Sequence, residues 1–178
     1  MMKNLFFLTL ILLFVSCNYN LVNKWENYDE SEEIKTNATI ENKRLQFKRI
    51  QSISNDKNQL INGFEREIFN FLENEYDLTK ELVHEKSIPE IQQSVIDGKL
   101  TYYKLSLFYL TRIYLIEFDK ESYLNSIISI NKNILREAKS KDKIKNSNIY
   151  SLYGIPILLK DNIGYKGLPT TAGAHSLK

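Results

Sequence analysis

The feature that most constrains this chain is a short apolar run, IPILL at residues 155–159, which stands between Gly154 and Lys160. Its branched aliphatic residues are typical of a buried strand. Pro156 lies near its start, where a strand tolerates a residue without an amide hydrogen. A buried strand must pair its backbone groups with neighbouring strands, and the chain offers few candidates for that role. The run therefore predicts a strand that depends on partners.

A lysine follows the run directly. In a strand with a period of two, Lys160 shares a face with Leu158 and Pro156. We therefore expect its amine to leave a buried strand end partly desolvated. Desolvation disfavours an ammonium ion and is the usual way in which a lysine becomes a base. Asp161 and Asn162 then favour a turn.

The middle of the chain reads as helical. Apolar residues recur at helical spacing between positions 56 and 75, which predicts an amphipathic helix there. Ser87 and Glu90 form a capping-box pattern, so a second helix is expected from there to about residue 97, with Gly98 ending it. Further helices are predicted over 101–118 and 132–140. In the 101–118 helix, Leu105, Phe108, Tyr109, Ile113 and Ile116 are expected to form the buried face.

The N-terminus has the pattern of an export signal. Lys3 is followed by an apolar stretch at residues 5–15, which is too short to span a bilayer as a helix. Val15-Ser16-Cys17 then resembles the lipobox of bacterial lipoproteins, in which the cysteine is lipidated and becomes the first residue. Cys17 is the chain's single cysteine; the alternative is an ordinary signal cut near Ser16. We expect an exported protein, lipid-anchored to a bacterial membrane in the cell envelope.

Composition excludes several functions. The chain has 178 residues, with 24 basic and 22 acidic side chains, and this balance gives no support for nucleic-acid binding. Two histidines and one cysteine argue against a zinc site, and we expect no metal or organic cofactor. Residues 18–58 are polar and are read as a tether, in which Trp25 either anchors the stretch or packs locally.

The segment around Lys160 carries a specific resemblance. GIPILLKDN at 154–162 and LPTTAG at 168–173 resemble the start of the amidase signature family of serine hydrolases. Upstream pieces follow the family's leading helices in order: 87–92, 98–101, 109–113, 124–125 and 130–131. The likeness covers residues 87–178. It implies an α/β fold, a mixed sheet covered by helices, of which this chain holds the leading helices and the first strand or strands.

The resemblance also implies a chemistry. The family hydrolyses carbon–nitrogen amide bonds with a Ser–cis-Ser–Lys triad, and the residue that transfers to this chain is Lys160, as the general base. Asn162, Thr170, Thr171 and Gly173 would shape the substrate loop, or serve loop geometry alone. Ala174-His175 departs from the family's frequent Gly-Ser pair, and His175 either touches substrate or is incidental.

The family's two serines are not found here. The sequence has no Ser-Ser pair and no stretch rich in Gly and Ser. We therefore expect a truncated amidase: residues 1–16 a lipoprotein signal, 17–58 a polar tether, 59–86 a helical arm, and 87–178 an incomplete amidase domain. Alone, such a fragment is expected to fold poorly and to lack activity. Its substrate would be a small-molecule or peptide amide, and an export signal argues against misacylated tRNA. The oligomeric state is left open.

Two other interpretations are kept. The chain is alternatively a non-catalytic, lipid-anchored pseudoenzyme whose helical body binds a partner. A phosphate site at the lysine and glycines has less support, because Lys160 precedes the glycines and the P-loop spacing is absent.

Overall fold

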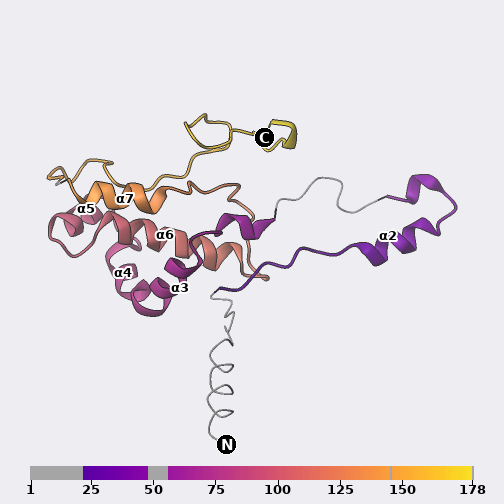
Figure 1. The fold of residues 1–178 in the computed structure, drawn as a ribbon, viewed down its shortest axis with the longest axis horizontal. Helices are drawn as coiled ribbons and strands as arrows, with labels where there is room; N and C mark the ends of the chain where they lie inside the picture. Colours follow the sequence, from indigo (N-terminus) through magenta and orange to yellow (C-terminus); the bar gives the residue numbers. More distant parts are fainter. Residues whose placement is uncertain (1–21, 48–55, 145, 178) are drawn as a thin grey trace, which may run out of the picture.

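The computed structural model describes residues 22–47, 56–144 and 146–177. A helical body occupies the middle of the chain, and a separate arm carries one helix away from it (Figure 1). The body's helices are α3 (Glu65–Asn74), α4 (Tyr76–Val83), α5 (Ile88–Ile96), α6 (Tyr102–Glu117) and α7 (Ile134–Asp142). The arm holds α2 (Ser31–Ala38). Short 3-10 turns are η2 (Lys43–Leu45), η3 (Lys57–Leu60) and η4 (His175–Leu177).

Helix α6 is the centre of the body. It packs against α3, α4 and α7, and its buried residues contribute to both hydrophobic clusters found among the described residues. Leu105 and Phe108 are buried as predicted. Ile113 and Ile116 are only half-buried, and Tyr114 and Glu117 take their places in the interior. The buried face is therefore partly polar, which a search for apolar spacing alone does not find.

The helix ends follow the local signals. Helix α5 begins after Ser87, whose backbone N–H donates to the Glu90 carboxylate at 2.8 Å, and Gly98 follows its end with a φ of +73°. Thr101 caps α6 by accepting a hydrogen bond from the Lys104 amide at 3.1 Å. The last predicted helix is observed as α7, two residues later than expected.

The single helix predicted over residues 56–75 is wrong in its first half. Residues 57–60 form the turn η3, and α3 begins only at Glu65. Gly63 lies between them with a φ of +87°, a left-handed conformation that interrupts a right-handed helix. The apolar spacing nevertheless marks buried positions, because Leu60, Phe64, Ile68 and Phe71 are all in the interior.

The predicted α/β fold is contradicted. The described residues form helices and turns and contain no strand, so this part of the chain is a mostly helical body. Residues 155–159 have no regular structure, and Ile157, Leu158 and Leu159 are exposed. A lone strand is costly because its backbone N–H and C=O groups stay unpaired, and no other described segment offers an edge with which this run can pair.

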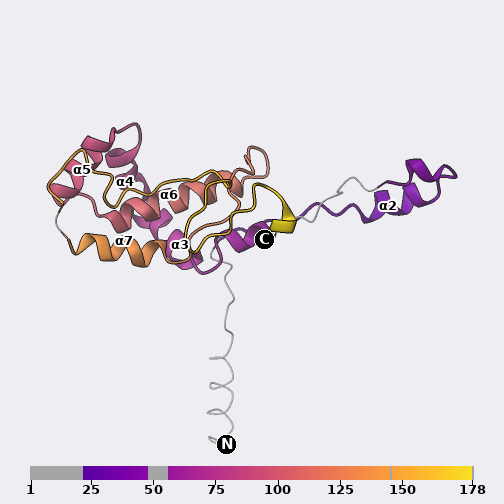
Figure 2. The ribbon, with the colours of Figure 1, turned by 90° about the horizontal axis from the view of Figure 1, so that it is seen from above.

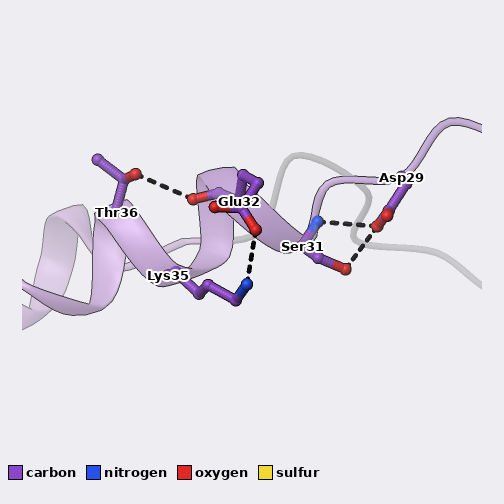
Figure 3. Close-up of polar contacts among 5 residues, drawn as sticks. All are labelled: Asp29, Ser31, Glu32, Lys35 and Thr36. Atoms are coloured by element: carbon purple, nitrogen blue, oxygen red, sulfur yellow. Dashed lines mark hydrogen bonds and ion pairs between the residues drawn. The ribbon is translucent and has the colours of Figure 1, made fainter.

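The arm with α2 extends well away from the body in both views (Figures 1 and 2). None of the residues of α2 is buried, so local contacts hold the helix. Just before it, the Asp29 carboxylate accepts hydrogen bonds from the amide and hydroxyl of Ser31, which lower the pKa of Asp29 (Figure 3). Lys35 pairs with Glu32 one turn below, and the Thr36 hydroxyl donates to the Glu32 carbonyl at 2.9 Å.

Before the arm departs, the first described residues are fixed to the body; we call residues 22–26 the strap. Val22 is buried among residues of α3 and α6. The Asn23 amide donates to the Tyr114 hydroxyl at 2.9 Å. The Trp25 amide donates to the Asn58 side chain at 2.8 Å, and the Asn58 amide group returns a hydrogen bond to the Trp25 carbonyl at 3.0 Å. Trp25 therefore anchors this stretch to a distant part of the chain.

A buried ion pair lies beneath the strap. The Lys57 ammonium donates to the Glu117 carboxylate at 3.1 Å and to the Glu117 carbonyl at 2.9 Å, and both side chains are almost fully buried. The ammonium also lies 4.3 Å from the ring centroid of Trp25 and 4.4 Å from that of Tyr123. These two rings meet edge to face. One cation thus joins η3, the end of α6 and the strap.

The expected signal at residues 1–16 and the lipidation site at Cys17 lie outside the described residues. Within the described ranges, no helix combines the length and the apolar character that crossing a bilayer requires.

The Glu117 carboxylate gives the body a pH dependence. Burial raises the pKa of Glu117, but hydrogen bonds from the amide and hydroxyl of Ser126, together with Lys57, outweigh it and leave the pKa below its ordinary value. The unfolded chain therefore binds a proton at a higher pH than the folded chain does. The stabilisation is complete above a pH of about 4.3 and is lost as the pH falls through the folded pKa.

Replacing Glu117 by Gln should lower the free energy of unfolding at neutral pH by about 3 kcal/mol, since Lys57 would be buried without its counter-charge. The difference from wild type should shrink below a pH of about 4.3. Urea unfolding of both proteins between pH 7 and 3 measures it. Exposed carboxylates titrate in both proteins, so the difference isolates Glu117. A difference that does not change with pH would contradict this account.

Candidate active site

The segment that holds Lys160 lies over one face of the helical body. Residues 146–177 run across the α6 and α7 side in both views (Figures 1 and 2). Lys160 is exposed, and so is Leu158, with 73% of its surface accessible. The prediction that Lys160 leaves a buried strand end partly desolvated is therefore wrong for this structure. The prediction fails because residues 155–159 do not form a strand. Within the described part of the chain, no layer of protein covers this run.

The chain turns immediately after the lysine. The Ile163 amide donates to the Lys160 carbonyl at 2.9 Å, which closes a tight turn around Asp161 and Asn162. This agrees with the expectation that these two residues form a turn. Lys160 thus stands at the entrance of a loop, with an extended apolar run on one side and a turn on the other.

Asp161 closes that loop onto itself. Its carboxylate accepts hydrogen bonds from the amide of Thr171 at 3.0 Å, from the hydroxyl of Thr171, and from the amide of Gly173 at 3.0 Å. Its carbonyl accepts a further bond from the Ala172 amide at 3.1 Å. A single acidic residue therefore holds residues 161–173 as a closed loop, because carboxylates accept several backbone amides strongly.

The loop residues singled out in the sequence have different positions. Thr171 is buried and its hydroxyl bonds Asp161, while Gly173 has a φ of +78° and donates its amide to the same carboxylate. Asn162 and Thr170 are exposed. Thr171 and Gly173 thus serve the geometry of the loop, which was one of the two roles considered for them. None of these contacts tests a role toward substrate.

The approach to the apolar run is anchored in the body through Gln92. This α5 side chain is fully buried, and its amide group donates to the carbonyls of Ser151 at 2.7 Å and Tyr153 at 2.9 Å. Its carbonyl oxygen accepts a hydrogen bond from the Tyr102 hydroxyl at 2.8 Å. Because Gln92 satisfies two backbone carbonyls of a segment without regular structure, it fixes where that segment leaves the body.

Close packing at Gly154 fixes the same point. A Cβ atom at Gly154 would lie 2.3–2.6 Å from ring atoms of Tyr102, and the residue has a φ of +74°. Both the space and the backbone therefore require glycine here. The anchor lies six residues before Lys160, and it ties the lysine segment to α5 and α6.

Within the described residues, no group of three or more histidine, cysteine or acidic side chains lies close enough to hold a metal ion. His175 begins η4, and its side chain lies outside what the structure describes.

The sequence reasoning missed the two residues that organise this region. Asp161 was read only as a turn former, although an acidic residue placed before a Thr-Ala-Gly segment was the available signal. Gln92 carries no signal in sequence, because a glutamine on a helix is usually exposed.

Replacing Asp161 by Ala should open the loop. The Thr171 amide would lose its acceptor, and the Gly173 amide would keep only the Thr171 hydroxyl oxygen at 3.2 Å. Hydrogen exchange of both amides should therefore accelerate at least about tenfold, which equals about 1.4 kcal/mol of local opening. Amide exchange followed by NMR measures this change. Asn162→Ala removes an exposed neighbouring side chain and should leave the rates as they are. Equal protection in both variants would show that the carboxylate does not hold the loop.

Replacing Gly154 by Ala should destabilise the body by about 2–4 kcal/mol, from the clash with Tyr102 and the left-handed backbone together. Gly98→Ala is a matched control, because Gly98 has nearly the same φ and open space around its Cβ position. It should lose only the backbone part, about 1 kcal/mol. Urea unfolding compares the two variants; equal losses would mean that Tyr102 gives way without cost.

The region that contains Lys160 is similar to a known protein family. Residues 109–178 match the family model described as Amidase, a range that begins within α6 and includes Lys160 and the closed loop. No solved structure matches the chain.

Similar proteins share one description, that of a glutamyl-tRNA(Gln) amidotransferase component. The chain is 34% identical over 96 residues to such a protein of Acinetobacter baumannii, covering 53% of this chain and 19% of that protein. The protein of Microcystis aeruginosa is 30% identical over 93 residues, with shares of 52% and 19%. The chloroplastic/mitochondrial protein of Arabidopsis thaliana is 30% identical over 89 residues, with shares of 49% and 16%. The chain thus spans about a fifth of the length of these relatives, and its similarity to the amidase family lies in residues 109–178.

Proposed function

We propose that this chain contributes the lysine of an amidase, an enzyme that hydrolyses a carbon–nitrogen amide bond. The observation that carries the proposal is the family match over residues 109–178, which contains Lys160 and the loop that Asp161 closes. The similarity to amidotransferase proteins over about half of this chain supports the same reaction class.

In this proposal Lys160 is the general base. Its neutral amine takes a proton from a bridging serine, which in turn takes the proton of a nucleophilic serine. The activated serine oxygen attacks the amide carbonyl, the carbon–nitrogen bond breaks, and the amine leaves with a proton. Water then releases the acyl group. The 178 residues hold no Ser-Ser pair, so both serines would come from polypeptide outside them.

The exposure of the lysine segment has a consequence for this proposal. A general base needs the neutral amine, and burial away from water favours the neutral form of a lysine. Lys160 would gain that state when further protein covers the run at 155–159. The exposed side chains of Ile157, Leu158 and Leu159 provide apolar surface for such a cover.

We further propose that the protein is exported and anchored through lipid on Cys17, on the sequence pattern of residues 1–17. An exported location argues against a tRNA substrate, although the relatives are named for one. A small-molecule or peptide amide remains the proposed substrate.

The second candidate is a non-catalytic lipoprotein that binds a partner. The exposure of Lys160 favours it.

A fluorophosphonate probe, which reacts with activated serines, separates the two candidates without knowledge of the substrate. The native gene product, isolated from its own cells, should be labelled and should hydrolyse members of a panel of simple and aryl amides. Lys160→Ala should reduce both signals at least about 100-fold, since general-base catalysis contributes typically that much. Lys166→Ala, an exposed lysine of the same loop, should retain both. Absent labelling of the wild-type protein, or equal labelling of the variants, would favour the non-catalytic candidate.

A further inference from the structure

The strap changes how this protein would be held at a membrane. The sequence alone describes residues 17–58 as one polar tether, whose root-mean-square length as a flexible chain would be about 35 Å. In the structure that stretch is interrupted at residues 22–26, where the strap is fixed to the body. Only the residues between Cys17 and Val22 then separate an anchor from the folded protein.

The attachment of the strap is built from independent contacts along its length. Val22 is buried with Leu110 and Tyr114. The Asn23 amide is bonded to Tyr114, and Trp25 exchanges two hydrogen bonds with Asn58.

Charged groups complete the attachment. Lys57, itself buried against Glu117, lies against the Trp25 ring at 4.3 Å. Glu26 pairs with Lys120 at 2.8 Å, which lowers the pKa of Glu26. Because apolar burial, backbone hydrogen bonds and a cation–π contact act on neighbouring residues within a stretch of five, releasing the strap requires several of them to break together.

We infer that the strap is a fixed mount, which holds the folded body close to the phospholipid surface that carries its lipid anchor. The five Cα–Cα steps from Cys17 to Val22 reach at most about 18 Å in an extended chain, so the mounted body cannot rise further than this above its anchor. The arm with α2 begins after the strap and returns at η3, so its length adds nothing to the reach. This inference rests on the lipid anchor at Cys17 proposed above.

The test compares two insertions of one flexible sequence. Twenty Gly/Ser residues, about 25 Å in root-mean-square length, are inserted either after Asn20, before the strap, or after Ile40, within the arm. The mature chain, residues 17–178, is coupled through the thiol of Cys17 to a maleimide lipid in a supported phosphatidylcholine bilayer. Neutron reflectometry then measures the height of the protein layer above the headgroups.

If the strap is a mount, the insertion before it should raise the body by roughly 10–20 Å, and the insertion in the arm should leave the height as in wild type. If residues 17–58 act as one tether, both insertions should raise the body by similar amounts, which would overturn the inference. Equal heights for all three proteins would also overturn it, because something other than the strap would then hold the body down.

A second pair of variants tests the mount without moving the anchor. In the chain with the arm insertion, Trp25→Ala removes the central contact of the strap and should raise the body. Lys24→Ala, an exposed neighbour, should not. Circular dichroism confirms that each variant keeps its helices. Unchanged height in the Trp25 variant would contradict the mount.

Maleimide coupling does not depend on lipidation in the cell, so the strap and the proposed lipid anchor are tested separately. The intact mass of the native protein from the membrane fraction shows whether Cys17 carries lipid, and failure there rejects the proposed anchor. The heights measured after maleimide coupling still report whether the strap holds the body close to its attachment point.

Discussion

The interior of this protein depends on one buried cation. The Lys57 ammonium must find counter-charge and acceptors inside the fold, since an unpaired buried charge costs several kcal/mol. Its partners come from distant positions: Glu117 at the end of α6, Tyr123 beyond it, and Trp25 in the strap. Satisfying Lys57 therefore requires these segments to meet. Ser126 adds two hydrogen bonds to Glu117, which extends the same network into the connection before α7.

The segment that contains Lys160, residues 155–173, is held in place differently from Lys57. The helical body is packed around α6, whereas Ile157, Leu158 and Leu159 are exposed and residues 161–173 hold their shape by local bonds to Asp161. Gln92 and Gly154 fix where the segment begins. The family match over residues 109–178 includes this segment, and its apolar side chains Ile157, Leu158 and Leu159 are exposed.

Local signals predicted the helices better than they predicted the sheet. The caps at Ser87 and Thr101 and the stop at Gly98 depend on neighbouring residues, so sequence reveals them. A strand depends on partners far along the chain, and the run at 155–159 has the right residues but no partner among those described. Polar residues inside the fold were missed for a related reason. Lys57, Gln92 and Glu117 are charged or amide side chains that are ordinarily exposed, and only their distant partners explain their burial.

Two partners of the strap lie far along the sequence, so the ribosome makes them long after the strap itself. Asn23 bonds to Tyr114, 91 residues later, and Glu26 pairs with Lys120, 94 residues later. When the chain leaves the ribosome, Asn58, the partner of Trp25, is made before α3, whereas Tyr114 and Lys120 follow only after α3, α4 and α5. The attachment of the strap therefore stays incomplete until α6 has been made, and any factor that recognises the leading residues has its opportunity before then. Attachment of the strap closes that period and marks the body as folded.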